Sequence, residues 1–199
     1  MFRKLIGKNG PLGPFVEYPV LLRLGLISVC AEMAWATLIL VMEYYFKDDL
    51  FPNQSAQLIA SRVAIALLAF TICETIFKVP MGKLSDRIGP RKVVVTALLF
   101  AVCSPLLMTF SREWWMFVPL RAVDGIAAAA LWPSMSALMA RAVPRNAKAA
   151  AMSVFNGAYC LGLAIGPLAG LYLGHILGNR WVFPLSSLAL AMGAFVAWK

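Results

Sequence analysis

"GKLSDRIGPRK", residues 82–92, places four cationic side chains and one carboxylate in eleven positions, between two long apolar runs. Two glycines and a proline stand among these charges. A segment with so much charge belongs in water, whereas the runs on either side are apolar enough to lie in lipid. This order therefore predicts two membrane-spanning helices joined by a polar turn.

The rest of the chain is as apolar as these two runs. Of its 199 residues, 61% are hydrophobic and 14% are charged, whereas about 25% of a soluble domain is charged. The composition predicts an integral membrane protein whose first partner is the lipid bilayer. The net charge of +9 does not indicate a nucleic-acid partner, because the cations lie between apolar runs and not along an exposed aromatic and basic face.

Six apolar runs are long enough to cross a membrane. A hydrocarbon core of about 30 Å needs about 20 helical residues, and the runs cover residues 20–44, 58–80, 93–110, 114–140, 150–177 and 181–198. Lipid offers no partners to backbone groups, so the spans are expected to be helices. The sequence predicts an all-α membrane protein with an amino-terminal segment, residues 1–19, and a six-helix transmembrane domain, residues 20–199.

The cations gather at alternate connections between the spans. They stand in residues 3–8, 82–92 and 141–148 and at Lys199, while the intervening connections carry few. Cytoplasmic connections are enriched in Lys and Arg. The bias predicts that both termini lie in the cytoplasm. We expect this multi-pass protein in the plasma membrane, the inner membrane in a bacterium.

Three motifs stand out, one between the second and third spans, one in the fourth span and one in the fifth. The spacing of Gly82, Leu84, Asp86, Arg87, Gly89, Arg91 and Lys92 resembles G-x-L-a-D-r-x-G-r-k, the signature of the major facilitator superfamily between helices two and three. "RAVDG", residues 121–125, is similar to its R-x-x-x-G element on helix four. "GLAIGPLAG", residues 162–170, is similar to G-x-x-x-G-P-x-x-G-G of its proton-coupled drug antiporters, although Leu171 replaces the last glycine.

The resemblance implies the amino-terminal half of this fold, six helices arranged as a 3+3 inverted repeat. Family members usually have twelve helices, so a carboxy-terminal six-helix half or a second protomer is expected as a partner. The implied function is secondary transport, with proton-coupled antiport or efflux of a small organic or drug-like solute and no cofactor. Uptake or export of a sugar, metabolite or lysolipid is an alternative, and so is a non-transporting scaffold or sensor.

The charged segment is a candidate gate. The resemblance implies that Asp86 acts as a cytoplasmic latch, with Arg87 and Arg91 as partners. The gating residues it assigns are Gly82, Asp86, Arg87, Gly89, Arg91 and Lys92. The alternative is a turn that only fixes the orientation of the chain in the membrane.

Ionisable residues inside the spans are candidates for proton or cation coupling. A lone charge at the bilayer centre costs about 2.5–3.5 kcal/mol on insertion scales, so it needs a partner, water or a proton. Glu32 has no cation within one turn of its own helix, and it could hold a proton until a cationic solute arrives. Arg121 and Asp124 are three residues apart and can pair. Purely structural roles for all three remain open.

The fifth span carries glycines at four-residue spacing. Gly162, Gly166 and Gly170 with Pro167 form a groove that admits another helix backbone. The resemblance implies that this groove also limits leak and pivots, while tight packing alone is the alternative.

The remaining polar residues indicate a solute cavity and no enzyme. Trp35 and Asn156 could line the cavity, although such residues are more often packing residues. The sequence contains no metal-binding cluster, nucleophile elbow or phosphate loop. We therefore expect neither catalytic residues nor a metal site.

Overall fold

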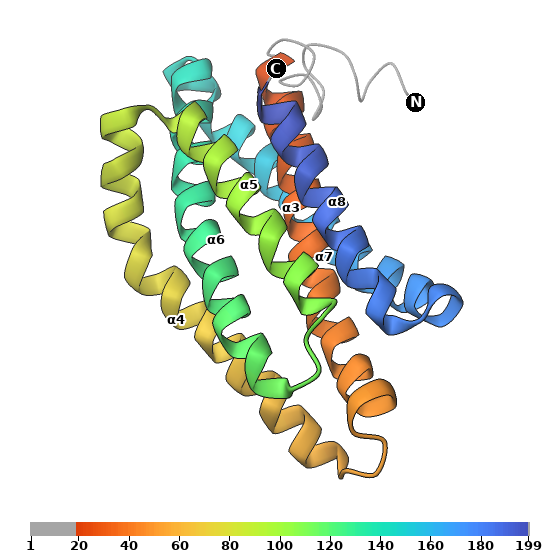
Figure 1. The fold of residues 1–199 in the computed structure, drawn as a ribbon. Helices are drawn as coiled ribbons and strands as arrows, with labels where there is room; N and C mark the ends of the chain where they lie inside the picture. Colours follow the sequence, from red (N-terminus) through yellow and green to blue (C-terminus); the bar gives the residue numbers. More distant parts are fainter. Residues whose placement is uncertain (1–18, 199) are drawn as a thin grey trace, which may run out of the picture.

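The computed structural model describes residues 19–198, which form a bundle of six long helices (Figure 1). Residues 1–18, nearly all of the predicted amino-terminal segment, and Lys199 lie outside the described residues. The helices are α3 (Pro19–Tyr44, continued by a π-helical segment, Tyr45–Leu50), α4 (Ala56–Ile88), α5 (Pro90–Met108), α6 (Trp114–Ala142), α7 (Lys148–Leu177, after a 3₁₀ turn at Arg145–Ala147) and α8 (Asn179–Trp198). Each of the six is long and apolar enough to cross a membrane, which confirms the predicted fold class.

The charged segment differs from the predicted turn, because nearly all of it is helical. Helix α4 continues through the first seven of its residues to Ile88, and α5 begins at Pro90. Only Gly89 separates the two helices, with a φ of 97° that residues with a Cβ rarely adopt. Charged residues are compatible with a helix once it leaves the hydrocarbon, so the glycine, and not the charge, ends α4.

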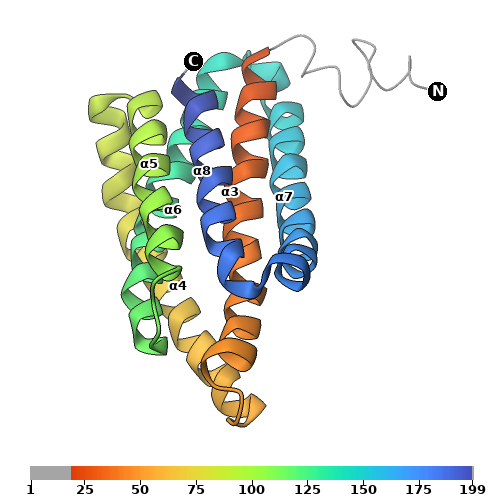
Figure 2. The same ribbon diagram turned by 45° about the vertical axis from the view of Figure 1, so that its right-hand side comes forward.

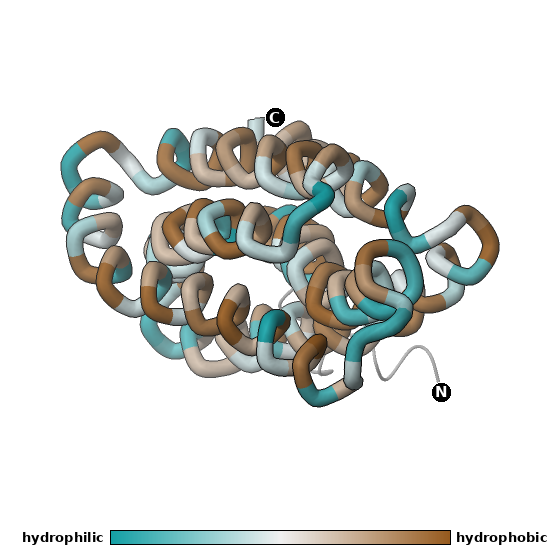
Figure 3. Tube along the Cα trace, turned by 60° about the horizontal axis from the view of Figure 1, so that its bottom comes forward, coloured by the Kyte–Doolittle hydropathy of each residue, from teal (hydrophilic) through white to brown (hydrophobic). Residues whose placement is uncertain are grey.

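Helix α4 is longer than a membrane is thick. Its 33 residues span about 50 Å, against a hydrocarbon core of about 30 Å. Hydrophilic residues gather mainly at the helix ends and connections of the bundle (Figure 3). The charged end of α4 therefore projects beyond the apolar part of the protein.

The helices pair in a pattern that repeats between the first three and the last three. Helix α4 packs on α6 and α7 packs on α3, while α5 contacts α6 as α8 contacts α3. The fifth large contact joins α5 to α8, the third helix of each triplet. Exchanging the two triplets leaves this set of pairs unchanged, as expected for a 3+3 inverted repeat. Figure 2 shows α8, α3 and α7 side by side in this order.

The cation-rich connections lie at one end of the bundle. The connections from α4 to α5 and from α6 to α7 share this end with the last residues of α8 (Figure 1). The connections from α3 to α4 and from α5 to α6 are at the opposite end. We refer to the first as the charged end; its predicted location on the cytoplasmic side remains a prediction.

The glycines of α7 lie directly against α3. A Cβ added to Gly162 would be 2.8 Å from the carbonyl oxygen of Val29, and one added to Gly166 would be 2.5 Å from that of Met33. The Thr37 hydroxyl lies 2.7 Å from the Gly166 carbonyl oxygen, which it can reach only because the helices are so close. The predicted groove is therefore occupied by α3 of the same chain.

Aromatic residues close the bundle toward the end opposite the charged end. The rings of Phe46 and Phe117 have centroids 4.9 Å apart, and those of Tyr45 and Phe183 are 5.3 Å apart. Arg180 donates from Nε to the Thr109 carbonyl oxygen at 2.7 Å, which ties α8 to the end of α5. These contacts hold four of the six helices together at this end.

Candidate functional site

A cavity of about 560 Å³ lies between α3, α4, α6 and α7. Helices α3 and α6 are the first of each triplet, and α4 and α7 the second, so both repeats contribute equally. The cavity contains polar and aromatic side chains in an otherwise apolar bundle; those used below are Glu32, Trp35, Phe70, Glu74, Lys78, Arg121, Trp132, Phe155, Asn156 and Tyr159. Trp35 and Asn156, the two predicted cavity residues, are both in this lining.

Arg121 and Asp124 form a buried ion pair on α6. Arg121 Nη1 lies 3.1 Å from Asp124 Oδ2, and the two side chains are 1% and 0% exposed. The guanidinium carbon lies 4.6 Å from the centre of the Phe70 ring on α4, a cation–π distance. Arg121 is therefore held by one contact on its own helix and one on the neighbouring helix.

This ion pair retains unused hydrogen-bonding capacity. Among the described residues, Arg121 Nε, Asp124 Oδ1 and Trp35 Nε1 are buried without a hydrogen bond of normal geometry, although the side chains of Ser104 and Trp35 approach Asp124. Unpaired polar atoms are costly inside a protein and cluster at functional sites. The site is thus polar in a place where packing alone would favour apolar residues.

Glu32 lies in the same cavity, on α3. Its side chain is buried and lies close enough to Tyr159 of α7, Glu74 of α4 and Arg121 of α6 to interact with all three. The sequence showed no cation near Glu32 because Arg121 comes from another helix. The structure therefore brings the three predicted coupling residues, Glu32, Arg121 and Asp124, into one region.

Aromatic rings line the same cavity as Glu32. The Trp132 ring makes edge contacts with Trp35 at 6.0 Å and with Tyr159 at 5.3 Å between centroids. Phe70 approaches Trp35 at 6.2 Å, and Phe155 approaches Trp132 at 6.4 Å. The rings come from all four helices of the cavity, and they give it a rigid, weakly polar wall.

A second ion pair lies farther along α4. Lys78 Nζ is 2.8 Å from Glu74 Oε1, one helical turn away, and both residues line the cavity. Glu74 lies near the middle of α4, because the helix continues to Ile88. The cavity therefore contains two carboxylate–cation pairs and one further carboxylate, Glu32.

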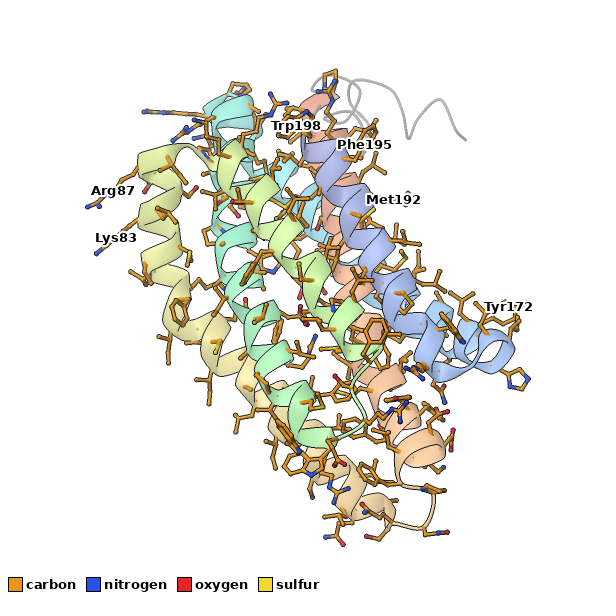
Figure 4. All side chains as sticks on the ribbon, in the orientation of Figure 1. Lys83, Arg87, Tyr172, Met192, Phe195 and Trp198 are labelled. Atoms are coloured by element: carbon orange, nitrogen blue, oxygen red, sulfur yellow. The ribbon has the colours of Figure 1, made fainter. Side chains whose placement is uncertain are left out.

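The gating residues lie at the charged end, away from the cavity. Asp86 is exposed, and the ion pairs of the described residues do not include it. Arg91, one of its expected partners, instead donates to the carbonyl oxygens of Ala197 and Trp198 at the end of α8. Arg87, the other, projects outward with Lys83 (Figure 4). The expected pairing of Asp86 with these arginines is thus absent from residues 19–198.

The aromatic residues Phe70 and Phe155 were not predicted as site residues. Both are phenylalanines within long apolar helices, where nothing in the local pattern separates a cavity residue from a lipid-facing one. Only the pairing of α4 with α6 and of α7 with α3 turns these two rings inward. The described residues contain no cluster of three or more His, Cys, Asp or Glu that could hold a metal ion.

Two repeats of helices around a polar cavity near mid-membrane form the architecture of many secondary transporters. The chain belongs to the Major Facilitator Superfamily, whose family model matches residues 24–199. The family predicted from the loop signature is therefore confirmed.

Individual relatives agree with this assignment. The chain is 29% identical to the uncharacterized MFS-type transporter YhjO of Bacillus subtilis over 116 residues, which are 58% of this chain and 29% of that protein. It is 30% identical to the multidrug resistance protein MdtG of Citrobacter koseri over 119 residues, 60% of this chain and 29% of MdtG.

Solved structures share the fold at lower identity. A peptide transporter POT crystallised with alafosfalin superposes with a TM-score of 0.77 at 16% identity, over 91% of this chain and 38% of the other. At this identity the likeness concerns the fold alone. The described bundle thus corresponds to little more than a third of that transporter, and the aligned segments to less than a third of YhjO or MdtG.

Proposed function

We propose that this chain is the amino-terminal half of a proton-coupled exporter of small organic solutes. The observation that carries the proposal is the position of Glu32, a carboxylate in an aromatic cavity whose other charged groups are already paired. The multidrug resistance protein MdtG among its relatives supports efflux of drug-like solutes. Plasma-membrane location with the charged end in the cytoplasm belongs to the same proposal.

The cavity needs a second wall. In the most apolar 18-residue stretch of each helix, only 17% of the residues of α4 and 22% of those of α7 are buried, against 67% in α3. These two helices flank the cavity on either side, so their exposed faces suit contact with another six-helix unit. A carboxy-terminal half of the same protein or a second protomer would complete the solute site between two rocking halves.

Glu32 would couple solute movement to protons by binding one or the other. As a charged carboxylate it attracts cations and hydrogen-bond donors of the solute, and as a neutral acid it releases them. Tyr159, Glu74 and Arg121 all lie close enough to Glu32 to interact with it. The Arg121–Asp124 pair would keep the arginine in place while Glu32 gains and loses its proton.

The test is transport by the complete protein in proteoliposomes. We expect Glu32→Gln to reduce solute movement driven by a pH gradient at least about tenfold, since glutamine cannot exchange a proton, while solute-for-solute exchange persists. Glu43→Gln is the matched control, because Glu43 is an exposed glutamate on the same helix, outside the cavity lining. Full proton-driven transport by Glu32→Gln would refute the coupling role.

For the charged end we propose that Asp86 engages the second half and holds the cavity closed on that side. Its exposure, and the lack of an ion-pair partner in residues 19–198, support a contact with groups outside this bundle. Asp86→Asn should lower the transport rate several-fold and leave membrane orientation unchanged. A normal rate in this variant would show that the segment only orients the chain.

A further inference from the structure

A shallow groove lies on the surface where α5 meets α8 at the charged end, far from the solute cavity. It has a volume of about 380 Å³ and is lined by Arg91, Lys92, Val95, Thr96 and Trp198. Trp198 is 71% exposed, and both cations are exposed as well. This surface faces away from α4 and α7, so a second transporter half seated on those helices would leave it open to lipid.

The rim of the groove is cationic. Arg91 donates from Nε to the Ala197 carbonyl oxygen at 3.3 Å and from a terminal nitrogen to that of Trp198, which fixes the guanidinium at the groove. These two bonds use two of the five N–H donors of an arginine. Lys92 follows directly on the same helix. Among the residues that the structure describes, none with an acidic side chain lines this groove.

The surface below the rim is apolar. Along α8, Trp198 is followed toward the membrane centre by Phe195, about one turn away and 59% exposed. Leu99 continues the apolar surface on α5. From the charged end inward, the surface presents cations, then a tryptophan, then apolar side chains. This order matches that of an anionic phospholipid, from its phosphate through the interface to its acyl chains.

We propose that this groove binds an anionic phospholipid, with its headgroup phosphate on Arg91 and Lys92 and an acyl chain along α5 and α8. Basic pockets between transmembrane helices recognise such headgroups by charge. The apolar lining distinguishes this occupant from a soluble phosphate, which would bury no hydrocarbon. Since Arg91 also holds the end of α8, the bound lipid would stabilise the contact between the third helices of the two triplets.

The experiment uses the protein purified in detergent and titrated with brominated phosphatidylglycerol or brominated phosphatidylcholine with the same acyl chains. Tryptophan quenching reports acyl-chain contact. We expect phosphatidylglycerol to bind more tightly than phosphatidylcholine. The ratio of the two affinities should fall by about fivefold for each cation removed, in Lys92→Gln and in Arg91→Gln. Glutamine at position 91 keeps a donor for the α8 carbonyl oxygens. Trp198→Phe should remove the saturable part of the quenching.

Lys83→Gln is the matched control, because it removes one charge at the same end of the protein but on α4, outside the groove. It should keep the wild-type lipid preference. Equal affinity for the two lipids, or equal losses in Lys83→Gln and Lys92→Gln, would overturn the proposal. Displacement of the lipid by millimolar inorganic phosphate alone would also overturn it, since that result would identify a site for the free anion.

Discussion

At the scale of single residues, the Arg121–Asp124 pair is a buried ion pair, and burying two charges is costly. Two charges without solvent exposure gain stability from each other only while both are present. Removing one partner of a buried pair leaves an uncompensated charge, whereas removing both is often nearly neutral. Asp124 is directly followed by Gly125, where a Cβ would meet the backbone of Phe70 and Glu74, so the pair lies where α6 closely approaches α4.

Asp124→Asn is therefore expected to destabilise the protein by about 3–5 kcal/mol, because Arg121 loses its counter-charge. The double variant Arg121→Gln, Asp124→Asn removes both charges and keeps groups able to hydrogen-bond, so it should lose clearly less. Unfolding in a denaturing detergent, followed by circular dichroism, measures both. Equal losses in the single and double variants would mean that the charge of Arg121 is compensated by another group.

The sequence predicted this pair but not its surroundings. A spacing of three on one helix brings Arg121 and Asp124 within reach whatever the rest of the chain does. The contacts with Phe70 and the approach of Glu32 depend on which helices are neighbours. Local spacing contains no such information, so the arginine could be assigned to a pair but not to a cavity.

At the scale of helices, the contact of α7 with α3 depends on the absence of side chains. Gly162, Gly166 and Gly170 are all buried against α3, and Thr37 hydrogen-bonds across the contact. The four-residue spacing predicted a groove for a helix, and α3 lies against these glycines in the structure. The partner helix could not be named from the spacing, because any helix backbone fits such a groove.

Gly166→Ala should destabilise the bundle by about 1–3 kcal/mol, because its Cβ would be 2.5 Å from the Met33 carbonyl oxygen and the helices would have to separate. Gly157→Ala is the control on the same helix, since a Cβ there would have no other atom within 4 Å. That variant should be neutral or slightly stabilising, because alanine favours a helix. The same detergent unfolding assay compares them, and equal effects would contradict the close-contact explanation.

The charged segment shows the opposite outcome at this scale. Its charges and its proline suggested a turn, yet the chain is helical on both sides of Gly89. Charge density reports where a helix leaves the lipid, and a backbone angle that only glycine tolerates reports where it ends. In this chain the charged segment begins seven residues before Gly89, the residue that ends the helix. The predicted turn was placed at the first charged residues and not at the glycine.

At the scale of the whole molecule, the apolar spans alone were enough to predict the fold class. Length and hydropathy fix the number of helices in lipid, since backbone groups there have no other way to be satisfied. The triplet pairing and the position of the cavity came from the resemblance and from the structure, because six apolar helices can pack in many orders. Of the six spans, α4 and α7 have the smallest share of buried residues in their apolar stretches, so they expose the most to their surroundings.

The predicted orientation can be measured by cysteine labelling in a cysteine-free background. Lys83→Cys and Arg145→Cys, both exposed at the charged end, should be protected from a membrane-impermeant maleimide in intact cells and react in inside-out vesicles. Asn53→Cys, exposed at the other end, should show the reverse. Labelling of all three positions in intact cells would exclude a single orientation with the charged end inside.

The exchangeable pairing of the two triplets has a consequence for biogenesis. Because the same pairs of helices form when the two triplets are exchanged, the helix contacts do not favour either orientation in the membrane. The orientation is therefore set by the few lysines and arginines of the connections, which are retained on the cytoplasmic side. Moving the cations of residues 82–92 and 141–148 to the opposite connections should therefore yield an upside-down bundle of ordinary stability, which the maleimide pattern would reveal as a complete reversal.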